Sequence, residues 1–192
     1  FGWGQVIACA LVAVFTILNV LGVQRTAQVQ NVLTAVKIAV LVGFIVLGFG
    51  ANGSTSNFAQ SAARDVPTSI PMQFAISLFW IYVSYSGWNA ATYVAEEIKQ
   101  PSRTLPMALG LGTALVTGLY LLLNVVFLYA APLEELKGKF AVGAFAASKL
   151  FGPQVASVFS GLMALSLMST VNAMVTVGPR VYYAMAKNEI GR

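Results

Sequence analysis

The stretch FWIYVSYSGWNAATYVAEEIKQPSR, from Phe79 to Arg103, decides how the fold of this chain is interpreted. It begins as an apolar helix and then places polar groups, a glycine and large aromatic rings in consecutive positions, from Ser84 to Asn89. Consecutive helical residues point in different directions, so no single polar face accommodates them. Glycine lowers helix stability, and serine offers the backbone other hydrogen-bond partners. We therefore expect the helix to break near residues 84–89. The alternative is a continuous helix that packs closely against a neighbour at Gly87.

The composition of the whole chain places this broken helix in a membrane. Of its 192 residues, 58% are hydrophobic and 9% are charged, whereas a soluble domain carries about 25% charged residues. This balance excludes disordered, nucleic-acid-binding and ordinary soluble-enzyme classes. The net charge of +5 comes from scattered basic residues, which indicates membrane topology rather than a nucleic-acid-binding patch. Exposed backbone at membrane depth is tolerated only where it lines a cavity, as in the broken helices of transporters.

The absence of histidine and the single cysteine, Cys9, limit the chemistry further. They exclude disulfides within the chain, Cys/His metal sites and a histidine proton relay. No pairing of a nucleophile with a base is apparent. We therefore expect no enzyme activity, no metal and no cofactor.

Apolar runs divide the chain into a single all-α transmembrane domain. A membrane-spanning helix needs about 20 mostly apolar residues, and five runs qualify: 3–20, 29–50, 71–95, 105–131 and 155–182. A short helix at about 140–151 is expected to lie in the membrane interface. The first apolar run begins at once without a basic leader, so we expect a fragment from the middle of a longer protein. The positive-inside rule weakly favours a cytoplasmic location for Arg25, Lys99, Arg103, Arg180, Lys187 and Arg192.

One charge, Lys37, lies inside an apolar run rather than at its end. It follows Val29 by eight residues, or roughly 12 Å of helix, and a central lysine costs about 2.5–3.5 kcal/mol on insertion scales. One interpretation is a lysine that anchors a frayed helix start at the interface. The other is a buried ammonium that faces a cavity or a partner helix. Burial favours the neutral form of lysine, so in that case Lys37 is a candidate for ion coupling.

Two further groups of polar residues are weaker signals. Glu96 and Glu97 end the third run, either as a solvated helix end that pairs with Lys99 and Arg103 or as part of a cytoplasmic gate. Within the fifth run lie Ser166, Ser169, Thr170 and Asn172. Serine and threonine in membrane helices often bond to their own backbone or to a neighbouring helix. The amide of Asn172 needs a partner.

Three segments resemble motifs of the amino acid–polyamine–organocation (APC) superfamily of amino acid permeases. YSGWN followed by AEEIKQPSRTLPMAL resembles that family's sixth helix and the loop after it. NVLGVQRTAQVQNVLTAVK, Asn19 to Lys37, resembles the junction between helices four and five, and STVNAMVTVGPRVYYAMAKNE, Ser169 to Glu189, resembles the eighth helix and its exit. Together they cover nearly the whole chain as helices four to eight.

The resemblance implies a LeuT-type fold of two inverted repeats, in which a broken sixth helix holds substrate at the membrane midplane. Lys37 matches a fifth-helix lysine whose ammonium replaces sodium in sodium-independent relatives. Its implied partners are the family's first helix and Ser169 or Thr170 of the eighth. Several relatives have a bulky aromatic gate where this chain has Val83. The implied substrate-binding residues are Val83, Ser84, Tyr85, Ser86, Gly87 and Asn89. The implied gate residues are Trp80, Tyr82, Trp88, Glu96 and Glu97.

From these features we expect a multi-pass secondary transporter in the cell membrane, working by alternating access. Its partners would be the lipid bilayer, an amino acid and, if transport is proton-coupled, protons. It would be sodium-independent, and either proton-coupled or exchanging. The pocket segment carries no carboxylate before Glu96, so we expect a neutral amino acid as substrate. The alternative is a non-transporting membrane scaffold or a transporter-associated subunit with the same fold.

Overall fold

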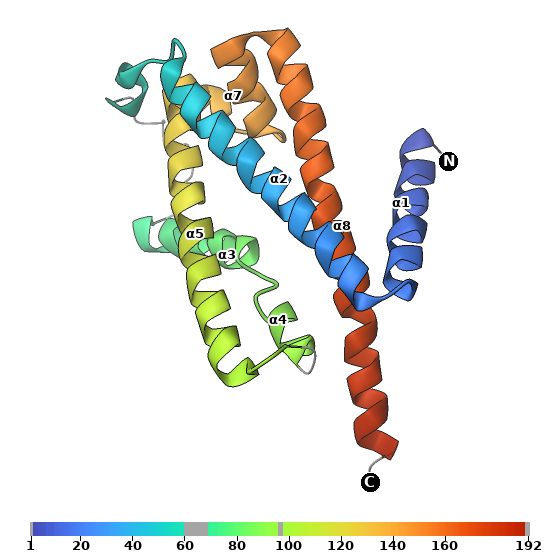
Figure 1. Cartoon of the computed structure of the whole chain (residues 1–192). Helices are drawn as coiled ribbons and strands as arrows, with labels where there is room; N and C mark the ends of the chain where they lie inside the picture. Colours follow the sequence, from blue (N-terminus) through green and yellow to red (C-terminus); the bar gives the residue numbers. More distant parts are fainter. Residues whose placement is uncertain (1, 60–68, 96–97, 191–192) are drawn as a thin grey trace.

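The computed structural model describes residues 2–59, 69–95 and 98–190, and within these ranges the regular structure is entirely helical (Figure 1). The long helices are α1 (Trp3–Val20), α2 (Val23–Gly50), α5 (Pro101–Ala130) and α8 (Pro153–Ile190). Between them lie η1 (Thr55–Ala59), α3 (Ile70–Ser84), α4 (Ala90–Tyr93), α6 (Leu133–Leu136) and α7 (Val142–Phe151).

Four helices of the described part are long and apolar enough to cross a membrane: Trp3–Val20, Gln24–Gly50, Pro101–Ala130 and Pro153–Tyr183. The sequence predicts a fifth span at 71–95, and this prediction is not confirmed. The apolar helix in that region, α3, has 15 residues and ends at Ser84, which is shorter than the roughly 20 residues that a span needs. The inverted-repeat arrangement stays a prediction.

The core lies where α2, α5, α7 and α8 meet. Phe44 of α2 stacks on Phe159 of α8 with ring centroids 4.4 Å apart. Gly48 brings α2 close to α5, since a Cβ at this position would lie 2.7 Å from a methyl carbon of Val126. Helices in a membrane associate through such close packing of small residues. The buried cluster comprises Phe44, Ile45, Leu123, Val126, Ala146, Ala147, Ala156 and Phe159.

The helix predicted at 140–151 is present as α7, which begins at Val142. Ala146 and Ala147 on one side of α7 are completely buried against the core, whereas Phe140, just before the helix, is fully exposed. This one-sided burial is compatible with a helix at the membrane interface, and its place there stays a prediction.

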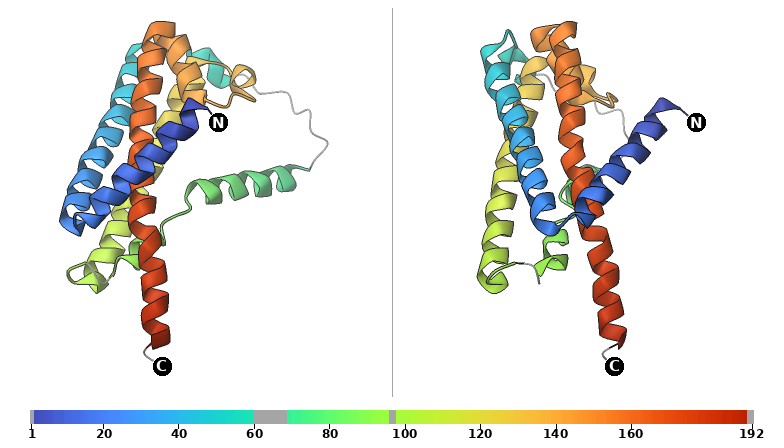
Figure 2. Two further views of the ribbon diagram at one scale, coloured as in Figure 1. Left: turned by 90° about the vertical axis from the view of Figure 1, so that its right-hand side faces the viewer. Right: turned by 45° about the vertical axis from the view of Figure 1, so that its right-hand side comes forward.

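Helix α3 lies across the long helices instead of alongside them, and α4 lies between the ends of α5 and α8 (Figure 2). Large apolar side chains of α3, including Phe74, Phe79 and Trp80, are more than half exposed. The chain therefore turns sharply between α3 and α4, in the segment where the sequence predicts a break.

Candidate functional site

The break between α3 and α4 spans the residues that the sequence singled out. Helix α3 ends at Ser84, turns occupy the next residues, and α4 begins at Ala90. Gly87 has φ = 95°, a left-handed conformation that glycine adopts without steric cost and other residues avoid. The helix is therefore interrupted at Gly87 and not continuous through it.

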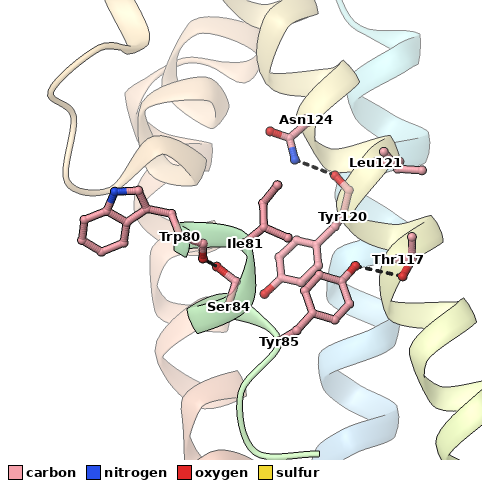
Figure 3. A pocket seen from close by; sticks show the side chains of 8 residues that line it. All are labelled: Trp80, Ile81, Ser84, Tyr85, Thr117, Tyr120, Leu121 and Asn124. Carbon is pink, nitrogen blue, oxygen red and sulfur yellow. Dashed lines mark hydrogen bonds between the residues drawn. The ribbon is translucent and has the colours of Figure 1, made fainter. Parts of the chain in front are cut away.

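A cavity of about 460 Å³ lies beside this break, between α3 and α5 (Figure 3). The Tyr85 hydroxyl lies 2.9 Å from the Thr117 hydroxyl of α5, within hydrogen-bonding distance. The rings of Tyr85 and Tyr120 lie side by side with centroids 5.8 Å apart, while the Trp80 indole points away from them. The cavity is lined by Trp80, Ile81, Ser84, Tyr85, Thr117, Tyr120, Leu121 and Asn124. Aromatic walls with a few hydroxyl and amide groups suit the part of a small molecule that is apolar or polar but uncharged.

Half of the residues that line this cavity belong to α5, and we did not predict them from the sequence. Thr117, Tyr120 and Asn124 recur at helical spacing on one face of an otherwise apolar helix. That spacing is the signal that was available in the sequence. The Asn124 amide nitrogen donates to the backbone oxygen of Tyr120, its own helix, so the asparagine is held at the cavity wall rather than bonded across it.

Only part of the predicted substrate-binding and gate set meets at this cavity. Trp80, Ser84 and Tyr85 line it. The Asn89 amide instead donates to the Tyr93 hydroxyl at 2.8 Å, within the α4 segment. The other described members do not line this cavity, and each of them is exposed: Tyr82, Val83, Ser86, Gly87 and Trp88. Glu96 and Glu97 lie outside the described residues.

Lys37 forms a second site, between α2 and α8. Helix α2 begins at Val23 and has 28 residues, so Lys37 lies near its middle and not at a frayed start. The Lys37 ammonium donates to the Thr170 hydroxyl at 3.2 Å. Ser169, the other expected partner, is buried and donates to the backbone oxygen of Ser166 at 3.1 Å. Lys37 also lines a cavity of about 580 Å³ between α2, α8 and the start of α7.

Sequence comparison gives these two sites a context. A family profile described as amino acid permease matches residues 3–190. The chain is 34% identical over 193 residues to the b(0,+)-type amino acid transporter 1 of Mus musculus. This alignment covers 94% of this chain and 37% of the relative. It is 29% identical over 187 residues to the human cystine/glutamate transporter, covering 95% of this chain and 36% of the relative.

A bacterial protein is similar over the same region. The serine/threonine exchanger SteT of Bacillus subtilis is 28% identical over 196 residues, covering 98% of this chain and 43% of the relative. The chain thus spans less than half the length of each of these relatives. No solved structure matches it significantly. Among the described residues, no group of three or more Cys, Asp or Glu side chains is placed to hold a metal ion.

Proposed function

The chain belongs to the amino acid permease family, and from this membership we propose that it is the central part of a multi-pass transporter that carries amino acids across the cell membrane. The observation that carries the proposal is the match of the permease profile to nearly the whole chain, residues 3–190. Membership of a permease family assigns the chain to transport rather than to catalysis. The alternating-access mechanism proposed for it follows from how broken membrane helices hold substrate in transporters.

The substrate site of this proposal lies at the break between α3 and α4. The interrupted helix leaves backbone groups and the side chains of Ser84 and Tyr85 beside the cavity. The hydrogen bond between Tyr85 and Thr117 ties the broken segment to α5. In this proposal Val83, Ser86, Gly87 and Asn89 complete the binding segment, and Trp80, Tyr82 and Trp88 form the aromatic gate.

We propose a neutral amino acid as the substrate. No charged side chain is among the residues that line the cavity beside the break. A charged substrate side chain would therefore lose its hydration there without gaining an opposite charge. The apolar walls from Ile81 and Leu121, with the hydroxyls of Tyr85 and Thr117, suit the side chain of a neutral amino acid instead.

Lys37 carries the proposed coupling role. Its ammonium holds a positive charge between α2 and α8, bonded to the Thr170 hydroxyl. A resident cation at this place removes the need for a bound sodium ion. Transport in this proposal is therefore sodium-independent, and either proton-coupled or an exchange of one amino acid for another. The similarity to a protein named as a serine/threonine exchanger favours exchange.

The test is uptake of labelled leucine by the intact protein, purified and reconstituted in liposomes. We expect uptake that depends on unlabelled amino acid inside the liposomes or on a pH gradient, that persists when choline replaces sodium, and that neutral amino acids compete. Inhibition by arginine alone would refute the neutral substrate, and a strict sodium requirement would refute the role of Lys37. A folded, inserted protein that moves no amino acid would instead fit the non-transporting scaffold.

A further inference from the structure

The interface between α2 and α8 is divided along its length into an apolar half and a polar half. Towards the end of α2, Leu41 and Phe44 pack with Phe159 and Met163 of α8. Towards the start of α2, the residues on the same helical face are polar: Thr26, Gln30 and Lys37. The part of α8 that meets them is polar too: Thr170 accepts from Lys37, and Asn172 donates to Gln30.

Asn172 is the most enclosed member of the polar half. It has no exposed surface, and its amide nitrogen donates to Oε1 of Gln30 at 2.8 Å. Its own Oδ1 is buried without a hydrogen-bond partner. Polar side chains inside a membrane are costly, and those that are present either bond across packed helices or belong to a functional site. The completely buried Asn172 amide, bonded to the half-buried Gln30, is therefore a candidate for a role beyond packing.

Neighbouring residues extend this pair into a hydrogen-bond network. The Gln30 amide nitrogen donates to the Thr34 hydroxyl on its own helix at 3.4 Å, which directs Oε1 of Gln30 towards α8. The Thr176 hydroxyl donates to the backbone oxygen of Asn172 at 2.7 Å and receives a hydrogen bond from Asn19 of α1 at 3.2 Å. The network therefore joins three helices.

This pair lies next to the coupling site along the same two helices. Gln30 and Lys37 are seven residues apart on α2, or two helical turns on one face. Their partners, Asn172 and Thr170, belong to a single turn of α8. The Gln30–Asn172 bond thus sets how α2 lies against α8 close to the point where the Lys37 ammonium meets Thr170.

We propose that Gln30 and Asn172 form a latch between α2 and α8 that positions the Lys37 ammonium at Thr170. Asn172 is then a positioning residue for the coupling step, acting through Lys37 and not by contact with substrate. In this proposal the apolar half of the α2–α8 interface stays packed, whereas hydrogen bonds in the polar half can rearrange. Such a rearrangement has an acceptor ready, because Oδ1 of Asn172 has no hydrogen-bond partner. The positioning role rests on the proposed transport function, and the latch itself does not.

The latch is tested by a double-mutant cycle on the thermal unfolding of the intact protein in detergent. The variants are Gln30→Leu, Asn172→Leu and the double variant, with Thr16→Val as matched control, because the Thr16 hydroxyl bonds only its own helix. Gln30→Leu leaves the buried Asn172 amide unpaired, and Asn172→Leu leaves Oε1 of the half-buried Gln30 without this donor, so we expect a lower unfolding midpoint from each. The double variant leaves neither amide unpaired, so its midpoint should fall no further than that of the worse single variant. Additive losses would overturn the latch. If Asn172→Leu does not fold, Asn172→Ser takes its place.

The positioning role is tested by two further measurements. In a second unfolding cycle that combines Asn172→Leu with Lys37→Gln, coupled losses support a link between the residues and additive losses refute it. In liposomes, we expect Asn172→Leu to lower the maximal rate about tenfold with an unchanged KM. A raised KM with an unchanged maximal rate would refute the role, because it would place Asn172 at the substrate site. If the wild-type protein moves no amino acid, the proposed function fails and the two unfolding cycles still decide the latch.

Discussion

The ammonium of Lys37 on α2 lies 3.2 Å from the hydroxyl of Thr170 on α8, although 133 residues separate them in the sequence. Lys37 is the charge that the sequence places inside an apolar run, and Thr170 is one of two adjacent hydroxyl residues that the family resemblance implies as its partner. The contact joins the two helices at the border between the apolar and polar halves of their interface. The coupling role proposed for Lys37 leads to the first two predictions.

Replacing Lys37 with glutamine should lower uptake of labelled amino acid at least about tenfold while the protein still inserts and folds. The substitution removes the positive charge that we propose takes the place of a sodium ion, and the amide can still bond Thr170. Lys149→Gln is the matched control, since Lys149 pairs with Glu135 and lies on α7, outside the four membrane-length helices of the described part. Unchanged uptake with an unchanged pH dependence in Lys37→Gln would contradict the coupling role.

Thr170→Val should slow transport more than Ser169→Ala does. Thr170 accepts the hydrogen bond from Lys37, whereas the Ser169 hydroxyl donates to its own helix. The lost charge-assisted bond is worth roughly 1.5–3 kcal/mol at most, so we expect the initial rate in liposomes to fall by at most about ten- to 150-fold in Thr170→Val. A larger loss from Ser169→Ala would show that the serine is the operative partner.

Tyr85→Phe and Thr117→Val should each raise KM for the transported amino acid by a few-fold, because a shared hydroxyl–hydroxyl bond holds the broken segment against α5. The double variant should be little worse than either single one, since both changes remove the same interaction. The control is Tyr183→Phe on an exposed part of α8. Effects that multiply would mean that the two hydroxyls act independently.

Gly87→Ala should destabilise the protein by about 1–2 kcal/mol, because its φ of 95° is strained for any residue with a Cβ. Thermal unfolding in detergent measures this, and transport should fall with it if the break shapes the substrate site. Gly161→Ala is the matched control. Gly161 is an exposed residue of α8 with open space at its Cβ position, so alanine there should be neutral or slightly stabilising. Equal stability of both variants would contradict the strain.

Much of the fold was predictable because hydrophobic composition and helix breaking are local properties. The first helix occupies the predicted range, Trp3–Val20, and the break after Ser84 follows from polar residues and a glycine in sequence. Apolarity predicts the spans and not where each helix ends. Helix α2 begins at Val23 instead of residue 29, since apolarity marks only the membrane-crossing part and the helix continues through Gln24 and Arg25.

For each candidate site, the residue pattern by itself pointed to the residues of one helix only. The break and Lys37 stand out because each violates what an apolar helix allows. Their partners on other helices do not stand out: Thr117 of α5 is an ordinary residue until the end of α3 brings Tyr85 to it, and Thr170 was implied only by the family resemblance.

By itself, the sequence determined that the chain is an all-helical membrane protein with one interrupted helix and one intramembrane lysine, because insertion and helix formation depend on composition and on near neighbours. The tertiary structure decided that Lys37 meets Thr170 and not Ser169. Adjacent residues of a helix point about 100° apart, so only the rotation of α8 against α2 selects between them. That rotation is set by the packing of Phe44 on Phe159 and by the burial of Asn172 against Gln30.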